Sequence, residues 1–176
     1  MAPRITPGRF KELGPINWAI WRVLSKASGA PDAHLFSTLG RTGGLFRGWL
    51  HYSGKLMPGG RLPRFESEMV IIRVAHLREC DYEMDHHKRL GKRAGVTPDI
   101  LERILGGPEA TGWSDKHRAL LTAVDELVAT KQLGDSTWTT LAAHYDDRRL
   151  IEILLLITQY DGLATTIGTL RLERDF

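Results

Sequence analysis

The sequence predicts an all-α protein. Alternation of apolar and polar residues with a period of two is nowhere sustained over the 176 residues, whereas apolar residues recur at helical spacing in most segments. Glycine and proline, often next to a residue that can cap a helix, separate these segments. We therefore expect about seven to nine helices packed around one core.

The first 14 residues are rich in proline, glycine and charge, and they are expected to form an extended arm before a single domain over residues 15–176. Thr97, Ser114, Asp135 and Asp147 are expected N-caps, because their side-chain oxygens can accept from free N–H groups in a first turn. The expected helices cover residues 16–25, 34–42, 45–56, 65–79, 81–94, 98–105, 115–131, 137–145 and 148–171.

Composition excludes several classes of protein. Lys plus Arg is 24 and Asp plus Glu is 21, so the net charge of +3 does not demand a nucleic-acid partner. The basic run at residues 86–93 has no interleaved aromatic platform, so no nucleic-acid site is predicted. The single cysteine excludes an intramolecular disulfide and a two-thiol redox cycle within one chain.

Neither a membrane span nor an export signal is predicted. The longest apolar stretch, residues 150–157, is short and interrupted by Glu152, which is typical of a core helix. No apolar signal segment follows the N-terminus, so the expected location is cytoplasmic.

Two consecutive helices place ionisable side chains among apolar ones. At about 100° per residue, Glu83 and His87 fall on the apolar face of helix 81–94, whereas Tyr82 falls on its outward face. Glu68 likewise shares a face with the isoleucines of the preceding helix. Because an isolated buried carboxylate is costly, we expect the helices to pack so that Glu68, Glu83, Cys80 and His87 meet.

This cluster has two interpretations. Two carboxyl groups beside an imidazole in a dry pocket have shifted pKa values, which suits general acid–base catalysis. A satisfied core network would use the same residues and would also shift their pKa values.

Cys80 is open to two interpretations as well. The N-terminus of the second helix and His87 would favour a reactive thiolate, whereas the carboxylates oppose it, and a free cysteine is more commonly a small buried hydrophobe. A zinc site built from these residues with His76 and His86 is not predicted, because the spacing matches no standard zinc motif.

Together these residues carry a family resemblance. The pattern Glu68-x11-Cys80-x2-Glu83-x3-His87 resembles the site motif of the alkylhydroperoxidase D / carboxymuconolactone decarboxylase superfamily. The stretch Cys-Asp-Tyr-Glu-Met-Asp-His-His from Cys80 is similar to the C-x-Y-E-W-x-x-H form of decarboxylase-like members. Glu83 stands where the hydroperoxidase branch has its second cysteine, and the resemblance extends over residues 45–170.

The resemblance implies an alkylhydroperoxidase D-like (AhpD-like) helical bundle that assembles as a homotrimer or homohexamer. It implies Glu68, Cys80, Glu83 and His87 as catalytic residues. Its members include thiol peroxidases and a lyase that decarboxylates a lactone acid.

Three functions remain open from the sequence. The first is acid–base chemistry on a small organic acid or carbonyl compound, with His87 moving a proton. The second is a peroxidase that uses Cys80 alone, and the third is a non-catalytic helical oligomer that binds an apolar ligand.

Further residues are expected at the edge of such a site. Trp49, Tyr82 and Tyr160 are candidate pocket residues. No organic cofactor is predicted, because no phosphate-cradling glycine motif follows a strand. Arginines at the pocket mouth are one candidate clamp for a substrate carboxylate. The alternative, which is the more common arrangement, is that they are scattered on the surface; the residues concerned are Arg41, Arg47, Arg61 and Arg64.

Overall fold

The computed structural model describes residues 2–176, which form nine α-helices, one short 3-10 helix and no β-strand. The all-α prediction and its upper helix count are confirmed for this part of the chain. The helices are α1 (Phe10–Ser28), α2 (His34–Leu39), α3 (Gly44–Leu56), α4 (Arg64–Leu77), α5 (Asp81–Arg93), α6 (Pro98–Gly106), α7 (Asp115–Thr130), α8 (Asp135–Ala142) and α9 (Asp147–Leu170), with the 3-10 helix at Gly40–Thr42.

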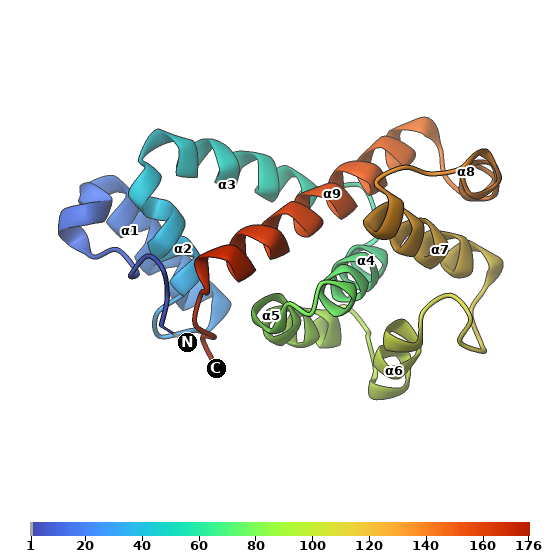
Figure 1. Ribbon diagram of the computed structural model, residues 1–176, viewed down its shortest axis with the longest axis horizontal. Helices are drawn as coiled ribbons and strands as arrows, with labels where there is room; N and C mark the ends of the chain where they lie inside the picture. Colours follow the sequence, from blue (N-terminus) through green and yellow to red (C-terminus); the bar gives the residue numbers. More distant parts are fainter. Residues whose placement is uncertain (1) are drawn as a thin grey trace.

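Helix α4 is the centre of the fold. It packs against α5, α6, α7 and α9, and all ten residues from Glu66 to Ala75 are buried. Helix α9 crosses the molecule beside it, with α1–α3 at one end and α6–α8 at the other (Figure 1). The anomalous polar residues of α4 therefore lie in the interior.

Two of the expected caps are observed, and two lie one residue earlier. Thr97 Oγ1 accepts from Ile100 N and Ser114 Oγ accepts from His117 N, as predicted. Helix α9 is capped by Asp146 and not by Asp147. Gly134 occupies the N-cap of α8, so Asp135 is its first helical residue.

The expected arm over residues 1–14 is too long. Helix α1 begins at Phe10, because the Glu12 carboxylate turns back to accept from Arg9 N at 2.9 Å and so stabilises the first turn. Gly14 has a positive φ of 69° and Pro15 follows it, so the helix is kinked where the arm was expected to end. Met1 lies outside the described residues.

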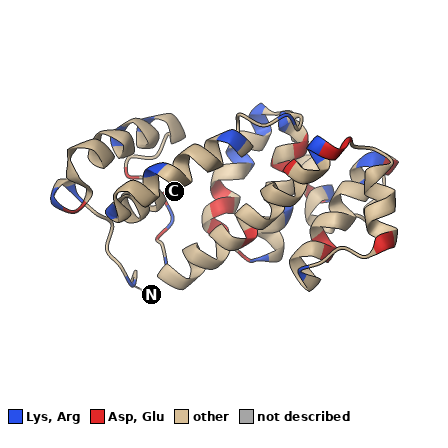
Figure 2. Ribbon diagram, turned by 90° about the horizontal axis from the view of Figure 1, so that it is seen from above, with Lys and Arg blue, Asp and Glu red and all other residues tan. Residues whose placement is uncertain are grey.

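Helix α9 has the length and apolar composition of a membrane span, and it is the one such helix in residues 2–176. A core helix of a soluble protein meets the same criterion, and α9 packs on α3, α4, α7 and α8. Its last part, residues 162–170, carries no charged residue (Figure 2). Glu152 near its start accepts from Arg61 N at 2.9 Å and Leu62 N at 2.8 Å, and so holds the α3–α4 loop. The cytoplasmic location stays a prediction.

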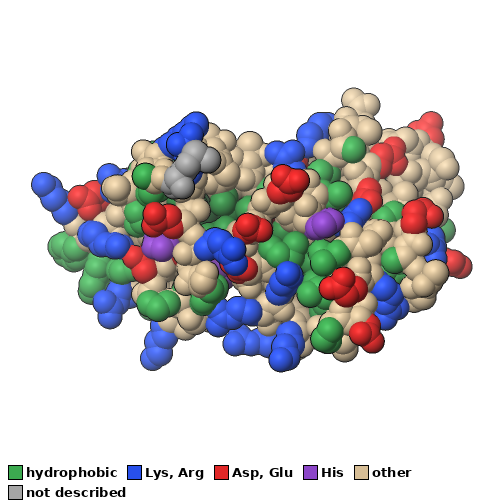
Figure 3. All heavy atoms as spheres, turned by 60° about the horizontal axis from the view of Figure 1, so that its bottom comes forward, with side chains coloured by type: hydrophobic (Ala, Val, Ile, Leu, Met, Phe, Trp, Pro, Cys, Tyr) green, Lys and Arg blue, Asp and Glu red, His purple; other side chains and the backbone are tan. Residues whose placement is uncertain are grey.

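The basic run on α5 is solvated. Lys88, Arg89, Lys92 and Arg93 are exposed. Figure 3 shows basic side chains on this face with acidic and hydrophobic ones between and beside them. The face therefore carries mixed charge, as expected for a solvated helix surface.

Candidate active site

Glu68 and His87 meet in the interior, as the helix faces predict. Glu68 on α4 is fully buried, and its Oε2 lies 2.8 Å from His87 Nδ1 on α5. Beside a carboxylate, Nδ1 is the nitrogen that carries the proton, which leaves His87 Nε2 as an acceptor. The Tyr160 ring meets the imidazole edge-on, with centroids 5.1 Å apart, and so fixes its plane.

Arg64 completes this arrangement. It lies one helical turn before Glu68, and its Nη2 is 2.6 Å from Glu68 Oε1, as an ion-pair contact rather than an aligned hydrogen bond. The cation and the imidazole together compensate the buried carboxylate. Arg64 thereby places a positive charge beside the Glu68 carboxyl group, on the side opposite to His87.

Glu83 has no such compensation. Its side chain is 3% exposed, and neither carboxylate oxygen has a hydrogen-bond partner among residues 2–176. Burial raises the pKa of Glu83 to about 8; the nearby Cys80 thiol moderates the rise and Asp161 adds to it. Glu83 is therefore a mostly neutral carboxylic acid near pH 7.

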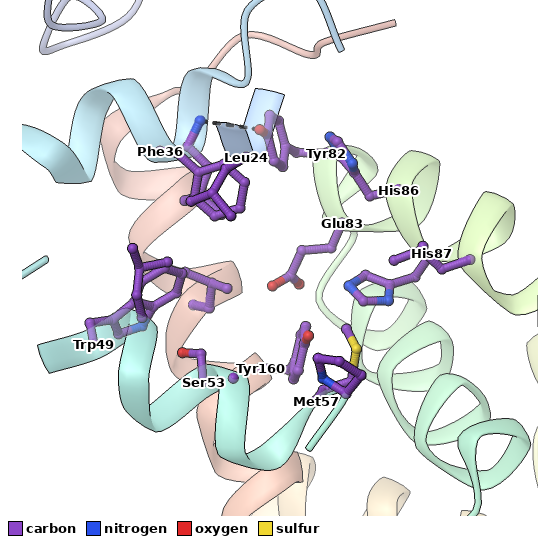
Figure 4. A pocket seen from close by; sticks show the side chains of 16 residues that line it. Leu24, Phe36, Trp49, Ser53, Met57, Tyr82, Glu83, His86, His87 and Tyr160 are labelled. Carbon is purple, nitrogen blue, oxygen red and sulfur yellow. Dashed lines mark hydrogen bonds between the residues drawn. The ribbon is translucent and has the colours of Figure 1, made fainter. Parts of the chain in front are cut away.

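A pocket of about 300 Å³ opens in front of Glu83 and His87. Figure 4 shows the Glu83 carboxyl group projecting into it from α5, with Tyr160, Trp49 and Ser53 around the same space. All three predicted pocket residues, Trp49, Tyr82 and Tyr160, line it. The other lining residues are Leu24, Leu35, Phe36, Leu50, Ser53, Gly54, Met57, Pro58, His86, Leu90 and Leu163.

The expectation that Tyr82 faces outward is wrong. Its side chain is 5% exposed, because the chain after α9 folds back over α5. The Tyr82 hydroxyl donates to Asp175 Oδ2 at 2.6 Å and accepts from Leu35 N at 3.1 Å. Its polar end is thus occupied, and only its ring faces the pocket.

Asp175 ties three segments together beside the pocket. Its side chain is fully buried, with His86 Nε2 at 2.9 Å from Oδ2 and His34 Nδ1 at 2.9 Å from Oδ1. Burial alone would raise the pKa of Asp175, but the hydrogen bonds from His86, Tyr82 and His34 N outweigh it and lower the pKa. This carboxylate positions α2 against α5, and no feature of the sequence pointed to it.

Cys80 lies apart from the pocket. It is the N-cap of α5, as its predicted place at the helix junction requires, and it packs in a small apolar cluster with Leu35, Tyr82, Ala164 and Ile167. It lines a different depression with His76 and Met84, which shares no residue with the pocket of Glu83. Burial and the neighbouring Glu83 raise the pKa of the thiol to about 12.

Comparison with known proteins fits this arrangement. Residues 43–126, which include α3–α6 and most of α7, match the model of the carboxymuconolactone decarboxylase family. The fold is similar to that of an uncharacterized peroxidase-related protein with an alkylhydroperoxidase AhpD core from Ralstonia eutropha JMP134. That match has a TM-score of 0.83 and 17% identity, and covers 98% of this chain and 92% of the other. The chain is thus similar to the carboxymuconolactone decarboxylase family over residues 43–126, and its fold is similar to that of proteins with an alkylhydroperoxidase AhpD core.

Two other proteins that are similar to this chain are informative. The uncharacterized protein YdfG of Bacillus subtilis (strain 168) is 24% identical over 101 residues, which is 56% of this chain and 69% of that protein. The debrominase Bmp8, solved as a cysteine-to-alanine variant in complex with 2,3,4-tribromopyrrole, is similar in fold. It has a TM-score of 0.81 and 15% identity, and covers 98% of this chain and 92% of the other.

The alternative of an arginine clamp is not supported by the pocket lining. None of Arg41, Arg47, Arg61 and Arg64 lines it. Arg47 instead donates to Asn17 Oδ1 at 2.9 Å, and Arg64 is turned to Glu68. The i,i+4 spacing of Arg64 and Glu68 was the available sequence signal for that ion pair.

No group of three or more His, Cys, Asp or Glu side chains in residues 2–176 is arranged to hold a metal ion.

Proposed function

We propose that this protein is an enzyme that moves a proton on a small neutral carbonyl compound held between Glu83 and His87. In this scheme the Glu83 O–H donates to the substrate carbonyl oxygen, and His87 Nε2 takes a proton from the adjacent carbon. The product is the enol, and the acid and base return to their starting states by exchange of one proton.

The observation that carries the proposal is the unpartnered Glu83 carboxyl group in an apolar pocket beside an oriented imidazole. A carboxylic acid whose pKa is raised to about 8 can donate a proton, and the nearby base His87 can accept one. Proton transfer on a substrate requires these two roles. Glu68 acts through His87 as a positioning residue. It fixes the tautomer and stabilises the imidazolium that forms.

The comparisons support a small organic molecule as the substrate, but they do not identify the reaction. A family named after a decarboxylase and a debrominase solved with a substituted pyrrole agree with a site for small organic molecules. The absence of arginine and lysine from the lining favours the carbonyl half of the predicted substrate class over the organic-acid half.

The test is exchange of carbon-bound hydrogen for deuterium in a panel of small ketones and lactones, followed by NMR. The wild type is expected to accelerate exchange beside the carbonyl, and Glu83→Gln and His87→Gln are expected to lower the rate by about 10²–10⁴-fold. Glu66→Gln, which changes a buried carboxylate of α4 outside the pocket, is the matched control. Equal rates in folded Glu83→Gln and His87→Gln protein would remove the proposal.

The other two predicted functions stay predictions. A peroxidase that uses Cys80 has less support, because this thiol does not line the pocket and its pKa is raised to about 12. A non-catalytic role would be indicated if no compound in the panel exchanged faster than in buffer.

We also propose that the chain forms a homotrimer or homohexamer. On α9, Ile151 is 59% exposed and Leu155, one turn later, is 41% exposed, which supports a contact with a second copy. Light scattering coupled to size exclusion measures the mass, and a monomeric mass would contradict this proposal.

A further inference from the structure

The Glu83 carboxyl group needs a partner that the described chain does not supply. Both of its oxygens are without a hydrogen bond, although the side chain is only 3% exposed. A buried polar group without a partner costs free energy, so a molecule that satisfies it gains affinity. Figure 4 shows this group aimed into the pocket rather than along its wall.

The pocket wall selects against charge. Of its sixteen lining residues, none is lysine or arginine. A carboxylate or phosphate would lose its water there with no cation to replace it, next to a carboxyl group. The lining side chains that can hydrogen-bond are those of Trp49, Ser53, Tyr82, Glu83, His86, His87 and Tyr160. Asp175 already engages His86 and the Tyr82 hydroxyl.

The wall also selects for a flat ring. Phe36, Trp49, Tyr82 and Tyr160 present aromatic side chains to the space, and five leucines line it as well. Phe36 and Trp49 lie with their ring centroids 6.5 Å apart, and Phe46 stacks behind Trp49 at 6.4 Å, so this side of the wall is braced. A volume of about 300 Å³ is at the lower end of the range for small-molecule pockets.

We propose that the pocket binds a neutral, single-ring hydroxyaromatic molecule of the phenol class, with its hydroxyl group against Glu83. A hydroxyl both donates and accepts, so it satisfies the carboxyl group whichever form that group takes. This inference rests on the proposed function, because a ring hydroxyl occupies the place of the enol oxygen in that scheme. Binding is nevertheless measured apart from catalysis.

The experiment compares four probes by calorimetric titration of the full chain: phenol, anisole, cyclohexanol and benzoate. Phenol is expected to bind about tenfold more tightly than anisole, which keeps the ring and loses the donor, since one hydrogen bond contributes about that factor. Cyclohexanol keeps the hydroxyl and loses the flat ring, so it is expected to bind more weakly than phenol. Benzoate is expected not to bind.

The variant Glu83→Leu removes the hydrogen-bonding group and keeps an apolar side chain of similar size. It is expected to bind phenol and anisole equally, while Glu66→Gln keeps the tenfold preference. Thermal melts establish that each variant is folded. A variant that still prefers phenol tenfold would contradict the role of Glu83.

Three outcomes overturn the proposal: anisole binding as tightly as phenol, benzoate binding as tightly as phenol, or no probe binding at millimolar concentration. None of them affects deuterium exchange into ketones, so the substrate class can fail while the proton-transfer proposal stands. Conversely, selective phenol binding without any exchange activity would support this site and remove the proposed reaction.

Discussion

Glu66 and Glu68 lie two residues apart on α4, and both are buried, yet they belong to different kinds of network. Glu66 is 4% exposed, with Lys116 Nζ 2.5 Å from Oε1 and the Tyr145 hydroxyl donating to Oε2 at 3.0 Å. Two residues correspond to about 200° of helical rotation, so Glu66 points away from Glu68 toward α7. Each of its oxygens has a partner, and neither it nor Lys116 nor Tyr145 lines the pocket.

Glu68 is compensated in a similar way, by His87 and Arg64, but its imidazole partner faces a cavity and a second, uncompensated acid. Burial and ion pairing therefore do not separate a structural carboxylate from a functional one. The distinction lies in an adjoining space and in one group, Glu83, that is left without a partner there. Four predictions test this difference.

The largest expected effect is on catalysis through Glu68. Glu68→Gln is expected to lower the exchange rate by about 10²-fold or more, because an amide neither fixes the His87 tautomer nor stabilises an imidazolium as a carboxylate does. NMR of ¹⁵N-labelled histidine is expected to show a changed Nδ1/Nε2 tautomer ratio for His87. A purely structural residue would leave this signal unmoved.

The control for this prediction is Glu66→Gln. It removes a carboxylate of the same helix with similar burial. It is expected to keep the exchange rate within about twofold, since neither Glu66 nor its partners Lys116 and Tyr145 line the pocket. Equal losses of activity in both variants would mean that the two networks do not differ in function.

The second effect is on stability as a function of pH. The pKa of Glu83 is raised from 4.5 to about 8, so the folded chain binds this proton more tightly than the unfolded chain does. Its contribution is fully present below the unfolded pKa and is lost as the pH rises through the folded pKa. Between about pH 6 and about pH 8, we expect the wild type to lose roughly 2 kcal/mol relative to Glu83→Gln.

Urea unfolding at the two pH values measures this difference. The absolute stability of Glu83→Gln does not matter, because the comparison concerns the slope with pH. Parallel stability curves for wild type and variant would mean that Glu83 is ionised in the folded protein, and the acid in the proposed reaction would then be absent.

Much of the difference between Glu66 and Glu68 could be predicted from the sequence, because the helix face on which a residue lies depends only on local spacing. The faces of helices 65–79 and 81–94 correctly predicted that Glu68 and His87 would meet. The family motif covers Glu68 and His87 together with Cys80 and Glu83. Periodicity also shows Glu66 and Glu68 on different sides of one helix, although it does not show which side adjoins a cavity.

The rest depends on contacts between distant segments. Leu24 and Phe36 contribute to the pocket from helices that precede the motif by more than thirty residues. Helix periodicity predicts an outward Tyr82, because nothing in its own helix shows that Asp175 covers it. Cys80 and Glu83 are three residues apart, yet only the packing of α9 and α2 directs one to an apolar cluster and the other to the pocket.

The third effect is on stability through Glu66. Glu66→Gln is expected to lower the free energy of unfolding by about 1–2 kcal/mol, because it weakens a charge-assisted bond to a partly exposed Lys116. Tyr145→Phe, which removes only the hydroxyl bond to the same carboxylate, is expected to cost less. Urea unfolding at one pH ranks the two variants, and no loss in Glu66→Gln would contradict the structural role of this network.

The smallest expected effect is on catalysis through Cys80. Its thiol pKa is raised to about 12 by burial in an apolar cluster and by the neighbouring Glu83, so the thiolate is scarce near pH 7. Cys80→Ala is therefore expected to keep the exchange rate within about twofold, in contrast to the loss in Glu83→Gln three residues later. Mass analysis of wild-type protein treated with peroxide and a sulfenic-acid trap is expected to show unmodified Cys80. A trapped sulfenic acid, together with loss of peroxide consumption in Cys80→Ala, would instead assign this protein to peroxide chemistry and leave Glu83 as a neighbour of the reacting sulfur.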